Sequence, residues 1–124
     1  MMNRLYIIEG TNTPKIYFDP DNNQFEITGK SFPEHAKKFY QPVFDWFRNF
    51  QPVKNQLTMN LRFHYISTSS ILVISELLKT LSDIGRNGCK VTVRWHYDKD
   101  DDDLRATGED LIGLTSCEIE LVPH

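Results

Sequence analysis

Four consecutive hydroxyl side chains, from Ser67 to Ser70, stand directly before an amphipathic stretch that begins at Ile71. A helix N-cap uses only one side-chain oxygen, so capping alone does not account for the whole cluster. A phosphoryl group on one of these hydroxyls would meet free backbone N–H groups and the positive end of a helix dipole, and the fold could therefore carry a dianion there. The cluster predicts a helix cap and is also a candidate phosphorylation site.

The histidines His64 and His96 are candidates for metal chemistry, because alternation predicts both on one face of a sheet. If their strands pair, the two imidazoles become neighbours, and Glu118 or Glu120 could add an oxygen ligand. No closely spaced ligand motif supports such a site, so surface histidines among salt bridges are the simpler interpretation. A small metal-dependent hydrolase acting from this face is the alternative function, and no metal ligand is assigned.

Other patterns that could do chemistry are incomplete. The acidic run from Asp98 to Glu109 is close to a calcium loop, but Asp103 stands where the sharp turn requires glycine. The cysteines Cys89 and Cys117 fit neither a disulfide framework nor a zinc site, and both are expected to be inert. With no nucleophile elbow and no glycine-rich phosphate loop, the sequence predicts a protein that is not an enzyme and binds no cofactor.

Hydrophobic periodicity predicts the elements that must position these residues. Three short strands, at 5–9, 15–19 and 24–29, form a meander. A helix that opens at Glu34 and is ended by Pro52 carries an aromatic stripe, in which Trp46 is expected among the most buried side chains. The remaining elements are a strand at 57–65 whose odd-numbered residues from Leu57 to Tyr65 are apolar, a helix from near Ser69 to Gly85, a strand at 91–97, a helix after Asp98 to Asp103, and a strand at 117–122.

The strands are polar at every second residue, and this pattern limits how the helices can cover the sheet. Parallel strands covered on both faces are apolar throughout, so we expect the helices to pack mainly on one face. The other, open face would carry Arg62, His64, Arg94, His96, Glu118 and Glu120. We therefore predict a single α/β domain over residues 1–124, with a mixed sheet and right-handed parallel crossovers between its last strands.

Composition limits the partners and the location. A net charge of -3 over 124 residues gives no electrostatic drive toward nucleic acid. The longest aliphatic run, 71–74, is too short to insert into a membrane, and the N-terminus lacks the apolar stretch of a signal peptide. The expectation is a cytoplasmic protein that binds no nucleic acid, while its homo-oligomeric state stays open.

Motifs spread over about Gly10 to Val122 resemble one known family. They are Thr13-Pro14, Phe18-Asp19-Pro20, Gly29-Lys30-Ser31-Phe32-Pro33-Glu34, Phe39-Tyr40-Gln41-Pro42-Val43, Asp45-Trp46, Tyr65 with Thr68-Ser69-Ser70, Trp95-His96-Tyr97-Asp98, and Gly108-Glu109-Asp110. In combination they resemble the SiaC family of regulatory phosphoproteins. The resemblance implies a STAS-like domain, similar to the anti-sigma factor antagonists.

The same resemblance implies a non-enzymatic switch protein, phosphorylated by a dedicated serine/threonine kinase and dephosphorylated by a PP2C-type phosphatase. Its unphosphorylated form would bind and activate a diguanylate cyclase or regulate another signalling target, and a cyclase would link it to cyclic di-GMP and biofilm growth. Carried onto this chain, the phosphoacceptor is Thr68. Ser67, which replaces an asparagine common in the family, and Ser69 are secondary acceptors.

Thr68 is expected at the amino end of a helix and at the carboxyl end of the preceding strand, where open α/β sheets usually present their sites. The next parallel strand ends at the same edge, so Asp98 is expected near Thr68. The partner-binding residues predicted at this edge are Thr68, Ser69, Ser70, Tyr97 and Asp98. Phosphorylation would place a dianion in an interface fitted to a neutral hydroxyl, and would release the partner without unfolding the domain.

Overall fold

The computed structural model describes residues 3–52 and 55–124, and within them the strands form one six-stranded sheet in the order β1-β2-β3-β4-β5-β6. The strands are β1 (Leu5–Ile7), β2 (Lys15–Asp19), β3 (Gln24–Ser31), β4 (Gln56–Ile66), β5 (Lys90–Tyr97) and β6 (Glu118–Pro123). The helices are α1 (Ala36–Arg48), α2 (Thr68–Arg86) and α3 (Asp102–Leu114), with a 3-10 turn η1 (Pro20–Asn22). β1 to β3 pair antiparallel and β3 to β6 pair parallel, which confirms the mixed sheet and the initial meander.

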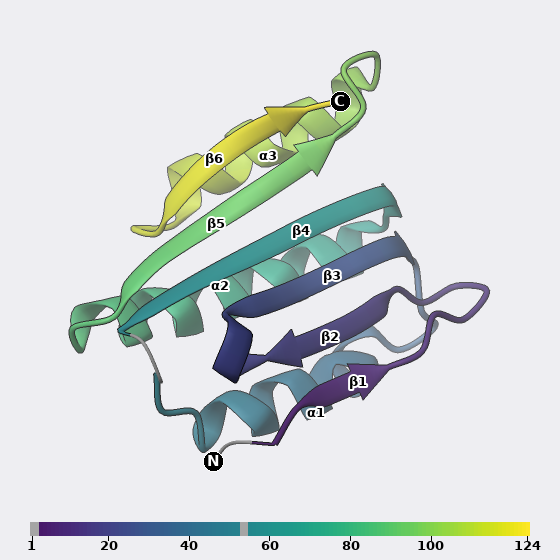
Figure 1. Ribbon diagram of the computed structural model, residues 1–124. Helices are drawn as coiled ribbons and strands as arrows, with labels where there is room; N and C mark the ends of the chain where they lie inside the picture. Colours follow the sequence, from purple (N-terminus) through teal and green to yellow (C-terminus); the bar gives the residue numbers. More distant parts are fainter. Residues whose placement is uncertain (1–2, 53–54) are drawn as a thin grey trace.

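In the described part of the chain, the three helices lie behind the same face of the sheet (Figure 1). Leu57, Met59, Leu61 and Phe63 point to this covered face and are buried, whereas the residues between them are only partly buried. The predicted packing of the helices on one face is therefore confirmed. None of the helices in the described ranges is long and apolar enough to cross a membrane.

The first helix differs from its prediction in its extent and in the burial of Trp46. It begins at Ala36, because His35 has a non-helical backbone (φ -128°, ψ 90°), and it ends at Arg48, before Pro52. Trp46 is only partly buried, so the expectation that it belongs to the most buried residues is wrong. It lies at the margin of the core, where its indole N–H donates to the Asn3 carbonyl at 3.0 Å. A tryptophan at a core margin satisfies its N–H in this way while its ring packs on apolar neighbours.

The third helix packs on the sheet through Gly108, which faces the fully buried Trp95. The Trp95 indole N–H donates to the Leu104 carbonyl at 2.9 Å, which fixes the ring under α3. A Cβ added to Gly108 would lie 2.5 Å from Trp95 Cδ1 and 2.8 Å from Leu121 Cδ2. The close approach of α3 to the sheet therefore requires glycine at this position.

We expect Gly108→Ala to lower the free energy of unfolding by about 1–3 kcal/mol, because the methyl group overpacks the contact with Trp95. Urea denaturation measures the effect. The matched control is Gly113→Ala in the same helix, where an added Cβ meets no heavy atom within 4 Å. The control should leave stability unchanged or raise it slightly. Equal losses in both variants would show that helix geometry, and not the Trp95 contact, sets the effect.

Candidate functional site

The first turn of α2, at the carboxyl edge of β4, carries the hydroxyl cluster. Ser67 is the N-cap, since its Oγ accepts a hydrogen bond from the Ser70 N–H at 3.2 Å. Its carbonyl accepts from the Ile71 N–H at 2.9 Å, and its own N–H donates to the Ser31 carbonyl on β3 at 2.8 Å. The predicted cap and the predicted position of Thr68 at the start of the helix are confirmed.

A chain of hydroxyl groups runs from this cap into the core. The fully buried Ser70 Oγ accepts hydrogen bonds from Ser67 Oγ at 3.1 Å and from Ser31 Oγ at 2.8 Å. Ser31 Oγ lies 2.6 Å from the hydroxyl of Tyr40 on α1. Burial raises the pKa of Tyr40 to about 12, so its phenol stays protonated at neutral pH. We define these four residues, Tyr40, Ser31, Ser70 and Ser67, as the hydroxyl chain.

Thr68 and Ser69, unlike Ser70, are exposed. Ser69 Oγ lies 3.2 Å from Ser67 Oγ. Within residues 3–52 and 55–124, the Thr68 hydroxyl makes no hydrogen bond to another side chain or to the backbone. Thr68 is thus an exposed hydroxyl without a hydrogen bond in the described residues, while Ser70 is fully buried and out of reach of a partner's surface.

A β-bulge in β4 changes the direction of the strand's last residues. Gly29 of β3 pairs with Phe63, but Lys30 pairs with Tyr65, so His64 is an extra residue on β4. A bulge moves the following side chain to the other face of a sheet. Tyr65 accordingly leaves the covered face, where alternation had placed it with Phe63, and is 49% exposed.

Exposed apolar side chains gather on the elements that meet at Thr68. Phe32, 37% exposed in the loop after β3, packs its ring against Tyr65 at a centroid distance of 5.3 Å. β4 leads from Tyr65 into Thr68, and Leu72 follows one turn later on the same side of α2, 62% exposed. We name Phe32, Tyr65 and Leu72 the apolar patch. The sequence offered one signal for it, since Leu72 falls outside the apolar stripe of its helix.

The other two predicted partner-binding residues, Tyr97 and Asp98, differ in exposure. Tyr97 is buried at 8% exposure and packs with the core, so its side chain is not available on the surface. Asp98 is exposed, and its carboxylate lies 4.0 Å from the guanidinium of Arg62. It borders a hollow lined by Asp100, Asp101, Asp102, Asp103 and His124, and no residue of the hydroxyl cluster lines that hollow.

The two histidines proposed for metal chemistry are not brought together. The strand register places His96 beside Arg62, and its ring nitrogens lie 2.8 Å from Asn60 Oδ1 and 2.9 Å from His124 Nε2. Glu120 pairs with Arg94 at 3.4 Å. In the described residues there is no group of three or more His, Cys, Asp or Glu side chains that could hold a metal ion. This geometry gives no support to a metal-dependent hydrolase.

We expect His96 to make the domain less stable in mild acid. Burial, and then the nearby His124, Arg94 and Arg62, hold the pKa of His96 below its ordinary value of 6.5. The unfolded chain therefore takes up the proton first, and the free energy of unfolding falls as pH drops below about 6.5. Urea denaturation at pH 7.5 and pH 5.5 measures this loss. In His96→Gln the loss should be smaller, and an equal loss would assign it to other groups.

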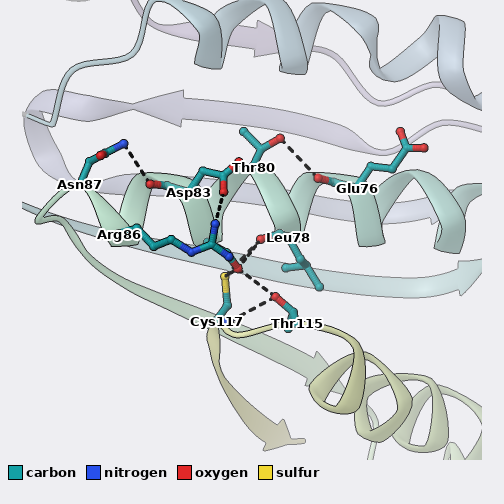
Figure 2. A network of polar contacts seen from close by, with 9 residues as sticks. Glu76, Leu78, Thr80, Asp83, Arg86, Asn87, Thr115 and Cys117 are labelled. Atoms are coloured by element: carbon teal, nitrogen blue, oxygen red, sulfur yellow. Dashed lines mark hydrogen bonds and ion pairs between the residues drawn. The ribbon is translucent and has the colours of Figure 1, made fainter.

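The cysteines are structural. Burial raises the pKa of Cys89, which keeps its thiol protonated. Cys117 lies 3.0 Å from Ser82 Oγ and donates to the Leu78 carbonyl at 3.2 Å, near the far end of α2 (Figure 2). Thiols with raised pKa values or structural hydrogen bonds are poor nucleophiles, in agreement with the sequence-based expectation for both residues.

Comparisons with known proteins agree with this architecture. Residues 7–124 match the family model described as SiaC family regulatory phosphoprotein. An uncharacterized protein of Pseudomonas aeruginosa strain UCBPP-PA14 is 32% identical over 99 residues, which cover 79% of each chain.

The solved structures that resemble this chain belong to the same family. The crystal structure of apo-SiaC from Pseudomonas aeruginosa superposes with a TM-score of 0.86 at 28% identity, covering 98% of this chain and 99% of the other. A chain from the crystal structure of diguanylate cyclase SiaD in complex with its activator SiaC, from the same organism, gives a TM-score of 0.87 at 28% identity, covering 97% and 99%.

Proposed function

Because the chain belongs to the SiaC family of regulatory phosphoproteins, we propose that it is a non-enzymatic signalling switch controlled by phosphorylation of Thr68. The unphosphorylated form binds a signalling target, and phosphorylation releases it. SiaC of Pseudomonas aeruginosa is the activator of the diguanylate cyclase SiaD in the complex with that enzyme. By analogy the target here is a diguanylate cyclase, and the output is control of cyclic di-GMP and biofilm growth.

The observation that carries this proposal is the place of Thr68, a free and exposed hydroxyl in the first turn of α2 beside the apolar patch. A phosphoryl group there would be favoured by the helix terminus by about 0.3–1 kcal/mol, so the domain tolerates it. A partner that covers the apolar patch would have to desolvate the same dianion, at a cost of several kcal/mol. The second effect is larger, so phosphorylation acts on binding and not on folding.

The surface that binds the target consists of Thr68, Ser69 and the apolar patch. A serine/threonine kinase and a PP2C-type phosphatase set the phosphorylation state. Ser69 is the stronger of the two secondary acceptors, because modification of Ser67 would break the cap of α2. In this proposal the protein works in the cytoplasm, and its domain is STAS-like.

The proposal is tested by affinity capture with two forms of the pure protein, unphosphorylated and stoichiometrically phosphorylated, with the phosphate mapped by mass spectrometry. We expect the phosphate on Thr68 and the cyclase enriched only on the unphosphorylated form. Tighter capture by the phosphorylated form would reverse the proposed direction of regulation. Phosphate only on Ser67 or Ser69 would move the switch to another residue.

A further inference from the structure

The hydroxyl chain places polar atoms at buried positions where apolar side chains would stabilise the fold equally well. Ser31 and Ser70 are fully buried, and Tyr40 is almost so. The four residues of the hydroxyl chain come from α1, β3, the cap of α2 and the first turn of α2. Buried polar networks do not raise stability above that of apolar packing, but when fully hydrogen-bonded they fix one geometry.

The directions of the hydrogen bonds in the chain follow from counting protons. A serine hydroxyl has a single proton to donate. Ser31 donates its proton to Ser70, so the 2.6 Å contact with Tyr40 requires Tyr40 to donate to Ser31. Ser67 also donates to Ser70, while its lone pair accepts from the Ser70 N–H. The cap of α2 is therefore linked, without a gap, to a donor on α1.

We infer that Tyr40 and Ser31 are positioning residues for Thr68: through Ser70 and Ser67 they hold the first turn of α2 in one conformation against α1. Thr68 itself makes no hydrogen bond to a side chain in the described residues, so its position depends on the turn that carries it. That this ordering matters for target binding rests on the proposed function. The ordering of the turn does not, and it can be measured on the free protein.

The same helix offers a matched control. Ser82, in the second half of α2, is another buried serine, and it bonds to the Leu78 carbonyl at 3.0 Å. It also lies 3.1 Å from Thr115 Oγ1, next to the end of α3. Ser82→Ala thus removes buried hydrogen bonds from α2 without touching the hydroxyl chain.

The test compares Tyr40→Phe, which keeps the ring and removes only the hydroxyl, with Ser82→Ala. Amide hydrogen exchange reports on Ser70 and Ile71, whose N–H groups are bonded by the cap. We expect Tyr40→Phe to speed exchange at these amides about fivefold relative to the slowest core amides, the effect of one lost hydrogen bond. Ser82→Ala should leave them unchanged. Ser31→Ala serves as a second variant and should act like Tyr40→Phe.

Binding to the cyclase gives the functional readout. We expect the double variant Ser31→Ala/Tyr40→Phe to bind several-fold more weakly than wild type, because the loosened turn must be ordered again on binding. Ser82→Ala should bind like wild type. Unchanged exchange at Ser70 and Ile71, or the same change in Ser82→Ala, would overturn the inference. If exchange responds as expected but wild type does not bind a cyclase, the proposed function fails and the positioning role stands.

Discussion

Replacing Thr68 by glutamate should weaken binding to the signalling target by about 100-fold or more while the domain keeps its stability. The carboxylate would lie at the amino end of α2, where the helix dipole favours a negative charge, so folding is not penalised. At the interface the same charge meets a surface fitted to the apolar patch and a neutral hydroxyl. An uncompensated charge buried in this way costs about 3–5 kcal/mol.

Thr68→Ala is expected to have the opposite phenotype: it binds the target with wild-type affinity and no longer responds to the kinase. Isothermal titration calorimetry measures affinity, and urea denaturation shows that both variants are folded. Ser116→Glu adds the same charge at an exposed position after α3 and controls for net charge. If Ser116→Glu weakens binding as much as Thr68→Glu, long-range repulsion explains the effect. If Thr68→Ala is still switched by the kinase, the acceptor is another hydroxyl.

The layout of the sheet could be predicted because the alternation of apolar and polar residues along a strand indicates which face of the sheet is covered. The polar residues between Leu57 and Phe63 showed that one face of β4 is open, and the structure has the helices on the other face. The prediction that Tyr65 points to the covered face with Phe63 is wrong for an equally direct reason. A single bulge at His64 reverses the parity of the strand, and nothing in an alternating run of residues signals an unpaired residue.

At the site, the burial of a side chain depends more on its position in the fold than on its residue type. Trp46 was expected in the core from its place in an aromatic stripe, but Trp95 is the fully buried tryptophan, because only it lies between the sheet and α3. Ser70 was expected at the partner surface from its place in a hydroxyl cluster. The partners that bury it, Ser31 and Tyr40, are distant in sequence, and no local pattern predicts their meeting.

We expect Tyr65→Ala to weaken target binding by about 30-fold, the effect of truncating a central aromatic anchor of an interface. Since Tyr65 is half exposed and Phe32 is its one ring contact among the described residues, stability should change little. Both quantities are measured on the pure protein, by calorimetry and by urea denaturation.

The position dependence of this effect is tested by a pair of leucines. Leu72, beside Thr68, and Leu114, at the end of α3, are 62% and 66% exposed and both lie on helices. Truncation of either to alanine removes the same atoms from side chains of similar exposure, so any nonspecific effect of lost surface hydrophobicity is common to both. We expect Leu72→Ala to weaken binding about tenfold and Leu114→Ala to leave it unchanged. Equal effects of the two substitutions, or a larger effect of Leu114→Ala, would place the interface away from Thr68, and phosphorylation could then not act by direct exclusion of the target.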